Sequence, residues 1–169
     1  MKGKVWKYGD DVNTDVILPG RYLSNYDAKF LASHAMEDID KEFAPNVKQG
    51  DIVVGGRNFG CGSSREQAAT CLTAAGVQAV VAKSFARIFY RNAINLGLPV
   101  IQAPELVEKL QKGDEVELDM EKGTVKLMRT GESVAFKSLP PFIMELLRDG
   151  GLIPHLKKQM AEKKGISQP

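Results

Sequence analysis

The sequence predicts an α/β protein with a mainly parallel central sheet, crossover helices and an antiparallel β meander near the C-terminus. Short apolar runs alternate with helix-length segments between residues 51 and 102, which is typical of parallel β-α-β units. Apolar and polar residues then alternate between 115 and 136, interrupted by glycine turns. The length of 169 residues suits a single core, so we expect residues 1–169 to form one domain with a basic tail at about 155–169.

The composition argues against several classes of function. A formal net charge of +2 gives no electrostatic case for nucleic-acid binding. The sequence has no apolar run of membrane-spanning length and no signal-type apolar core at its start, so we expect a cytoplasmic protein without a membrane partner. The two cysteines, Cys61 and Cys71, cannot supply the three or four thiolates that an iron–sulfur cluster requires. Any such cluster must sit on a partner chain.

The first fifty residues predict a strand at 4–8, a polar loop at 9–15 and a helix at 27–40. Asn25 or Asp27 is a reasonable N-cap for that helix. The aspartates of the polar loop could bind a divalent ion, but their spacing does not match an EF-hand loop. We therefore favour turn formation and hydrogen bonding as their role, and we expect no metal site in this chain.

The remaining elements follow from apolar periodicity and from turn residues. A strand at 52–54, a helix at 64–75 and a strand at 77–82 should form a parallel, right-handed crossover. Ser84 should cap a second helix that ends near Gly97, before a strand at 98–102. Beyond the meander, prolines at its start and a glycine after its end predict a closing helix at 140–150.

The glycine-rich segment 55–67 stands between the first crossover strand and its helix. Its four glycines allow close approach to the backbone, and Ser63-x-x-Glu66 and Ser64-x-x-Gln67 are two overlapping capping patterns. A helix start attracts anions, and Arg65 adds a planar fork of donors suited to a carboxylate. In proteins with a parallel sheet, ligands bind beyond the carboxyl ends of the strands, where this segment lies. We therefore predict an anion site with hydroxyl groups here. The alternative is a loop that only makes a turn.

Three segments of this chain, 56–67, 83–88 and 11–16, resemble motifs of the 3-isopropylmalate dehydratase small-subunit family, which corresponds to the swivelling domain of the aconitase family. The resemblance covers roughly residues 4–153. It implies a three-layer swivelling domain and a hydro-lyase that isomerises 2-isopropylmalate to 3-isopropylmalate in leucine biosynthesis. It also implies a large-subunit partner that carries a [4Fe-4S] cluster, whose open iron acts as a Lewis acid on a small dicarboxylic hydroxy acid.

The same resemblance assigns roles to individual residues. Ser63 would remove a proton from the carbon next to a substrate carboxylate, and Ser64 and Arg65 would bind carboxylate. Ser24 and Asn25 occupy positions that tune which substrate side chain is accepted, and Arg21 is a candidate second carboxylate contact.

Two alternatives stay open at this point. Because no arginine stands at positions 24 and 25, homoaconitate is disfavoured as the substrate. Related hydro-lyases of 2,3-dimethylmalate or citraconate remain possible, as does an anion-binding swivel module without chemistry.

The assignment of Ser63 as a base raises one physical difficulty. A serine hydroxyl needs fixed positive potential to gain alkoxide character, and a serine that caps a helix has its oxygen engaged with the backbone. We therefore expect Ser64 or the loop backbone to cap the helix, with Ser63 pointing outward.

Overall fold

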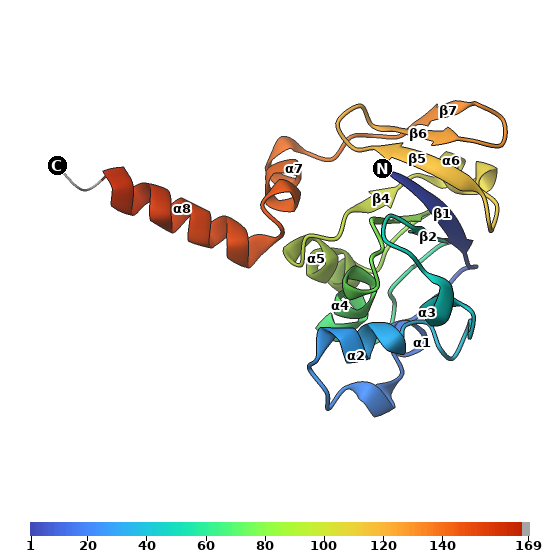
Figure 1. Ribbon diagram of the computed structural model, residues 1–169, viewed down its shortest axis with the longest axis horizontal. Helices are drawn as coiled ribbons and strands as arrows, with labels where there is room; N and C mark the ends of the chain where they lie inside the picture. Colours follow the sequence, from blue (N-terminus) through green and yellow to red (C-terminus); the bar gives the residue numbers. More distant parts are fainter. Residues whose placement is uncertain (167–169) are drawn as a thin grey trace.

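The computed structural model describes residues 1–166, so the last three residues of the predicted basic tail lie outside the described part of the chain. The strands are β1 (Lys2–Lys7), β2 (Ile52–Gly55), β3 (Ala79–Ala82), β4 (Val100–Gln102), β5 (Glu115–Asp119), β6 (Thr124–Leu127) and β7 (Ser133–Ala135). The helices are α1 (Thr14–Ile17), α2 (Ala28–Ser33), α3 (Phe43–Asn46), α4 (Glu66–Ala74), α5 (Arg87–Asn95), α6 (Pro104–Lys109), α7 (Pro141–Arg148) and α8 (Leu152–Ile166), with a 3₁₀ turn η1 (Gly20–Tyr22). Figure 1 shows their arrangement.

The seven strands form one sheet in the order β4-β3-β2-β1-β5-β6-β7. Strands β1 to β4 pair in parallel, with Val53 opposite Trp6 on one side and Val80 on the other. From β5 onward the pairing is antiparallel, which confirms the predicted meander. The predicted fold class is thus confirmed, with the meander joined to the parallel strands as a continuation of the same sheet.

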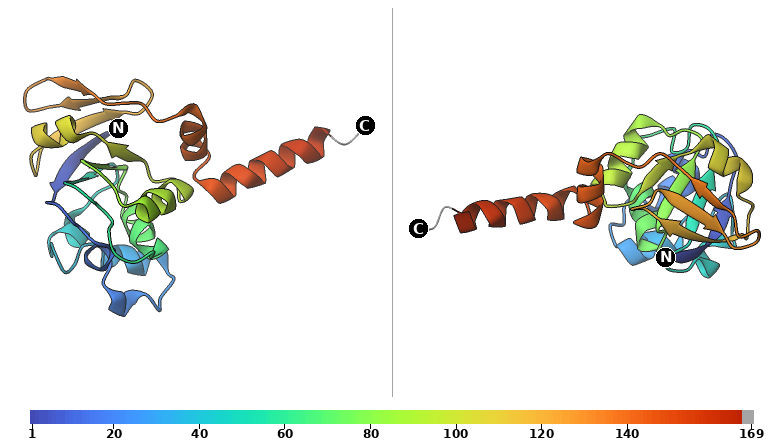
Figure 2. Two further views of the ribbon diagram at one scale, coloured as in Figure 1. Left: turned by 180° about the vertical axis from the view of Figure 1, so that it is seen from behind. Right: turned by 90° about the horizontal axis from the view of Figure 1, so that it is seen from above.

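Both faces of the central strands β2 and β3 are buried, and their sequences are apolar throughout, whereas β1 keeps exposed lysines. One face, which includes Val53 and Val80, packs against α2, α4 and α5. The other face, which includes Ile52 and Val81, packs against α6 and the inner side of the meander. The sheet therefore curls over α6, as Figure 2 shows from two further directions.

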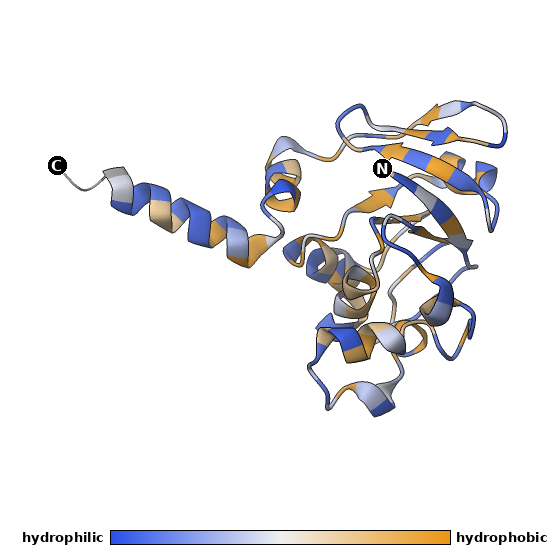
Figure 3. Cartoon of the chain, viewed as in Figure 1, coloured by the Kyte–Doolittle hydropathy of each residue, from blue (hydrophilic) through white to orange (hydrophobic). Residues whose placement is uncertain are grey.

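The last helix, α8, projects away from the rest of the chain in Figures 1 and 2 and is mainly hydrophilic along its length in Figure 3. All its residues from Leu156 to Gly165 are exposed to solvent. The described basic side chains of the tail thus lie on an exposed helix. Among the described residues, no helix is long and apolar enough to cross a bilayer.

The helix expected at 27–40 is shorter than predicted. Asp27 caps its start, because its carboxylate accepts hydrogen bonds from the backbone of Lys29 (2.9 Å) and Phe30 (3.1 Å). The helix ends at Ser33, and the buried Met36 has a φ of +60°. The backbone N–H of Met36 donates to the carbonyl of Ile17 (2.8 Å), so this contact with α1 replaces continued helical bonding.

Ser84 does not cap the second crossover helix, which corrects a further prediction. Helix α5 begins at Arg87, and its N-cap Ala86 has no capping side chain. The Ser84 hydroxyl instead accepts a hydrogen bond from the backbone N–H of Asn58 (2.8 Å). The serine predicted as a cap therefore holds the glycine-rich segment in place.

Candidate active site

The glycine-rich segment 55–67 lies at the carboxyl ends of β1, β2 and β3, between the two loops that follow β1 and β3. On one side, Gly60 N donates to the carbonyl of Val12 (2.7 Å) and Thr14 N donates to the carbonyl of Cys61 (2.8 Å). On the other side, Phe59 N donates to the carbonyl of Ser84 (3.0 Å). The three motifs noted in the sequence are thus hydrogen-bonded to one another at one edge of the sheet.

Glycine at position 60 allows the loop to lie directly on the aromatic core. Gly60 has a φ of +82°, and a Cβ there would come within 2.2 Å of the Phe89 ring. Phe89 is 2% exposed and packs edge-on against Phe59, with ring centroids 5.3 Å apart. The backbone that leads to Ser63 is therefore seated on a rigid, buried support.

Ser63 is exposed, and its hydroxyl faces the loop after β1 rather than the helix. The Ser63 Oγ lies 3.2 Å from the Thr14 Oγ1, and the Thr14 hydroxyl also reaches the Ser63 carbonyl at 3.2 Å. Thr14 itself is 1% exposed. The Ser63 hydroxyl thus contacts the Thr14 hydroxyl and does not cap the helix, and Ser63 as a residue is exposed to solvent.

The capping patterns predicted at Ser63 and Ser64 do not form. Helix α4 begins at Glu66, and Arg65 occupies the N-cap position without a capping side chain. Within the described part of the chain, the backbone N–H groups of Glu66 and Gln67 have no hydrogen-bond partner. The cap fails because the backbone after Gly62, with a φ of +101°, turns Ser63 toward Thr14. Free donors therefore remain at a helix N-terminus, where an anion is stabilised.

The Arg65 side chain reaches from the glycine-rich segment to residues 15–20, which follow β1. Its guanidinium forms an ion pair with Asp15, and a Cβ on Gly20 would lie 3.5 Å from its Nη1. The Arg65 side chain is 26% exposed, and its buried Nη1 makes no well-aligned hydrogen bond. Asp15 therefore holds the guanidinium by charge contact, and the planar donor fork is not saturated.

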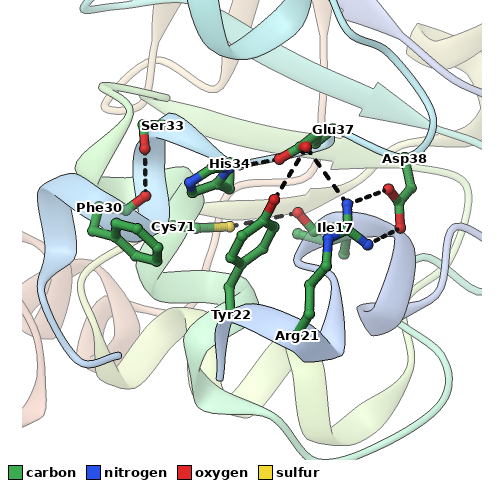
Figure 4. Close-up of polar contacts among 9 residues, drawn as sticks. All are labelled: Ile17, Arg21, Tyr22, Phe30, Ser33, His34, Glu37, Asp38 and Cys71. Carbon is green, nitrogen blue, oxygen red and sulfur yellow. Dashed lines mark hydrogen bonds and ion pairs between the residues drawn. The ribbon is translucent and has the colours of Figure 1, made fainter. Parts of the chain in front are cut away.

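Arg21 pairs with acidic residues outside the group formed by Ser63, Arg65 and Asp15. Its guanidinium binds both oxygens of Asp38 (2.8 and 3.2 Å) and reaches Glu37 at 3.5 Å, as Figure 4 shows. The pKa of the Asp38 carboxyl is lowered, chiefly by the hydrogen bond from Arg21. The neighbouring Tyr22 stacks on His34 with ring centroids 3.8 Å apart. To contact a substrate carboxylate, Arg21 would have to leave this pair.

The two other predicted substrate-side residues lie on the same loop. Ser24 is exposed, and the Asn25 carboxamide accepts a hydrogen bond from the backbone N–H of Asp27 (2.8 Å). In the described structure, no hydrogen bond or ion pair joins Ser24 or Asn25 to Ser63, Ser64 or Arg65. The loop approaches the site at its start, because a Cβ added at Gly20 would lie 3.5 Å from the Arg65 Nη1.

Both cysteines are free thiols with raised pKa values. Burial raises the pKa of the Cys61 thiol, and Asp11 adds to this shift. Burial also raises the pKa of Cys71, which is fully enclosed and donates to the carbonyl of Ala68 (3.2 Å). Two thiols are also fewer than the three or four that an iron–sulfur cluster requires. The cysteines of this chain do not fit an iron–sulfur cluster.

The serines lie on an open surface. Two hollows of about 740 and 420 Å³ occur elsewhere on the described surface, one beside Trp6 and Asp51 and the other beside Lys83 and Glu108. Neither is lined by Ser63, Ser64 or Arg65. A small acid bound at these residues alone would be largely exposed, so a second surface is needed to enclose it.

The fold and this loop define a class that comparison with known proteins also gives. Residues 15–106 match the model of the aconitase C-terminal domain family. The chain is 52% identical over 161 residues to the 3-isopropylmalate dehydratase small subunit of Thermodesulfovibrio yellowstonii, covering 95% of this chain and 96% of that protein. It is 54% identical over 162 residues to the isopropylmalate/citramalate isomerase small subunit of Methanocaldococcus jannaschii, with 96% of each chain covered.

A solved structure agrees with these relatives. The crystal structure of 3-isopropylmalate dehydratase (LeuD) from Methanocaldococcus jannaschii superposes with a TM-score of 0.93, at 45% identity and 98% coverage of both chains. The class is that of aconitase-type C-terminal domains. Within it, this chain belongs to the 3-isopropylmalate dehydratase small subunits, a hydro-lyase family. A small subunit by this name implies a large-subunit partner.

Sequence reasoning did not foresee two contacts of the site. Thr14 and Asp15 belong to a loop to which we assigned only turn formation and hydrogen bonding, yet Thr14 contacts Ser63 and Asp15 pairs with Arg65. The available signal was the presence of segment 11–16 among the three related motifs. A polar segment at the end of a parallel strand, beside a glycine-rich segment at the same edge, indicates contact between the two.

Proposed function

We propose that this chain is the small subunit of a cytoplasmic hydro-lyase that converts 2-isopropylmalate to 3-isopropylmalate in leucine biosynthesis, together with a large subunit. The observation that carries this proposal is the exposed Ser63 hydroxyl, free of helix capping, beside the ion-paired Arg65 and the free N–H groups of α4. The names of relatives about half identical over nearly the whole chain support the same reaction.

Ser63 acts as the base in this proposal. As an alkoxide, it takes a proton from the carbon that bears a substrate carboxylate. The electron pair left behind forms a carbon–carbon double bond as the hydroxyl group leaves the neighbouring carbon. Return of the proton to the carbon that lost the hydroxyl group, and of the hydroxyl group to the carbon that lost the proton, completes the isomerisation. The α4 N-terminus and Arg65 stabilise the alkoxide and the carboxylate because both carry negative charge.

The remaining residues bind and select the substrate. Ser64 and the Arg65 fork bind a carboxylate, with Asp15 holding the guanidinium in place. Ser24 and Asn25 face the substrate side chain once the loop at 19–27 closes over it, and Arg21 contacts a second carboxylate if its pair with Asp38 opens.

In this proposal the large subunit supplies the Lewis acid of the reaction. A [4Fe-4S] cluster there would provide Lewis-acid assistance to the departing hydroxyl. Cys61 and Cys71 are too few to hold such a cluster, which is consistent with a cluster held elsewhere. The open surface at Ser63 is consistent with an active site completed by a second protein.

Citramalate is a second candidate substrate, because a relative 54% identical over 96% of this chain is named for both acids. Both acids carry two carboxylates and differ in the size of the apolar group. In this proposal Ser24 and Asn25 contact that apolar group and decide between the two acids.

Anaerobic reconstitution tests the proposal. Each subunit alone, and both together, should be given 2-isopropylmalate, citramalate, 2,3-dimethylmalate, citraconate and homoaconitate. We expect turnover only with both subunits, fastest with 2-isopropylmalate and absent with homoaconitate. A cluster-loaded large subunit that binds this chain yet turns over none of these acids would refute the enzymatic proposal and leave an anion-binding module.

A further inference from the structure

Thr14 is one of few buried polar side chains in the described structure, together with Asp51, Asp114 and His155. Its hydroxyl carries one proton and lies 3.2 Å from two oxygens of the same residue, the Ser63 carbonyl and the Ser63 Oγ. A buried hydroxyl requires a hydrogen-bond partner, and here both candidate partners belong to the residue proposed as the base.

The position of the Thr14 oxygen is fixed independently of its side-chain contacts. The Thr14 backbone N–H donates to the carbonyl of Cys61 (2.8 Å), and Asn13 caps α1 by accepting from Val16 N at 3.0 Å. Gly62 leaves room for the hydroxyl, since a Cβ there would lie 3.2 Å from the Thr14 Oγ1. The loop after β1 thus presents one hydroxyl to Ser63 from a rigid support.

We propose that Thr14 is a positioning residue that stabilises the alkoxide form of Ser63. Its hydroxyl does so by turning its single hydrogen bond from the Ser63 carbonyl to the Ser63 Oγ. This inference rests on the proposed role of Ser63. When Ser63 is neutral, the Thr14 hydroxyl donates a hydrogen bond to the Ser63 carbonyl and accepts one from the Ser63 hydroxyl. When Ser63 is an alkoxide, rotation of the Thr14 hydroxyl directs its proton to the charged oxygen. No bond other than these hydrogen bonds changes.

The direction of the effect follows from the charge. A hydrogen bond donated to the ionised form of a group lowers the pKa of that group. Removing the Thr14 donor therefore raises the pKa of Ser63, and the alkoxide-dependent limb of the pH–rate profile moves to higher pH. At 3.2 Å the contact is long for two hydroxyls, but hydrogen bonds to a charged oxygen shorten, and catalytic contacts tighten in the reacting complex.

Two substitutions separate a hydrogen-bonding role from a packing role. Thr14→Val keeps the shape of the side chain and removes the hydroxyl, whereas Thr14→Ser keeps the hydroxyl and removes the methyl group. In the reconstituted two-subunit enzyme, we expect Thr14→Val to lower kcat about 10- to 100-fold. This is less than the loss of about 10²- to 10³-fold that follows removal of a well-placed oxyanion donor, because the contact is long. KM should change less than about 3-fold, and Thr14→Ser should retain kcat within about 3-fold.

Thermal unfolding and the pH dependence of kcat complete the test. A Thr14→Val protein that keeps kcat and its pH profile, or a Thr14→Ser protein that loses kcat to the same extent, would overturn the inference. If Thr14→Val does not fold, the decision falls to Thr14→Ser, whose kcat must stay near that of the parent. Ser63→Ala is measured in parallel: full activity in that variant removes the proposed role of Ser63 itself, whereas its inactivity beside an unaffected Thr14→Val removes only the role of Thr14.

Discussion

Substitution of Gly60 by alanine tests whether the glycine-rich segment depends on its close approach to the aromatic core. A side chain at the left-handed φ of +82° costs about 1–2 kcal/mol. The added Cβ would also lie 2.2 Å from Cγ and 2.3 Å from Cβ of Phe89, which is buried and cannot swing away. Overpacking of this kind costs about 1–3 kcal/mol. Loss of glycine freedom in the unfolded chain returns about 0.4–1 kcal/mol.

The net expectation for Gly60→Ala is a loss of about 2–4 kcal/mol in the free energy of unfolding, which at this chain length lowers the Tm by about 4–16 °C. Two other glycines are matched controls. Gly131 has a φ of +74° with open space around it, so Gly131→Ala should lose about 1 kcal/mol. Gly9 has open space and no left-handed φ, so Gly9→Ala should be neutral or slightly stabilised.

Urea unfolding of the three variants measures these differences directly. The difference between the losses of unfolding free energy in Gly60→Ala and Gly131→Ala gives the cost of overpacking against Phe89. If the two lose the same free energy, the Phe89 contact does not constrain the loop, and the reasoning about its rigid support is wrong.

Two further predictions concern charged side chains. Arg65→Lys should raise KM about 10-fold or more in the reconstituted enzyme, because a point charge cannot reproduce the planar fork that pairs with Asp15 and is proposed to bind the substrate carboxylate; an unchanged KM would exclude carboxylate binding by this side chain. Burial opposes ionisation of Asp40, yet hydrogen bonds from Tyr8 (2.9 Å) and Lys112 (3.2 Å) prevail and lower its pKa. Its contribution to stability, about 1–2 kcal/mol, should be present above its unfolded pKa near 3.9 and be lost as the pH falls through the lower folded pKa. Urea unfolding of Asp40→Asn should therefore differ from the parent at pH 7, and the difference should shrink as the pH falls below about 3.9; a constant difference would contradict the assignment.

The sequence was sufficient for the order of the strands along the chain and for the change from parallel to antiparallel pairing. Apolar runs such as Ile52–Gly55 are buried on both faces, and the period of two in Glu115–Asp119 matches its one buried side. Helix boundaries were less predictable because tertiary contacts decide them. Met36 leaves the helical path to bond Ile17, and Ser84 bonds Asn58 instead of its own helix. The short helix Pro104–Lys109 was not anticipated.

The candidate site was predictable in its location but not in its internal contacts. The strand, the glycine-rich segment and the helix placed Ser63 and Arg65 at the carboxyl edge of the sheet. Capping patterns in sequence assume that a serine bonds its own helix, whereas the positive φ of Gly62 directs Ser63 to a residue 49 positions earlier in the chain. Contacts such as Ser63 with Thr14 and Arg65 with Asp15 depend on how separate loops meet, which local patterns do not specify.

The measurement that most directly tests the central claim is the turnover of Ser63→Ala together with its association with the large subunit, in the same preparation. Ser133→Ala, which alters an exposed serine on β7, is the matched control. Turnover of 2-isopropylmalate by the Ser63→Ala complex should fall at least about 10³-fold with unchanged subunit affinity and Tm, while Ser133→Ala matches the parent. Near-normal turnover by a fully assembled Ser63→Ala complex would contradict the role of this loop as half of the active site.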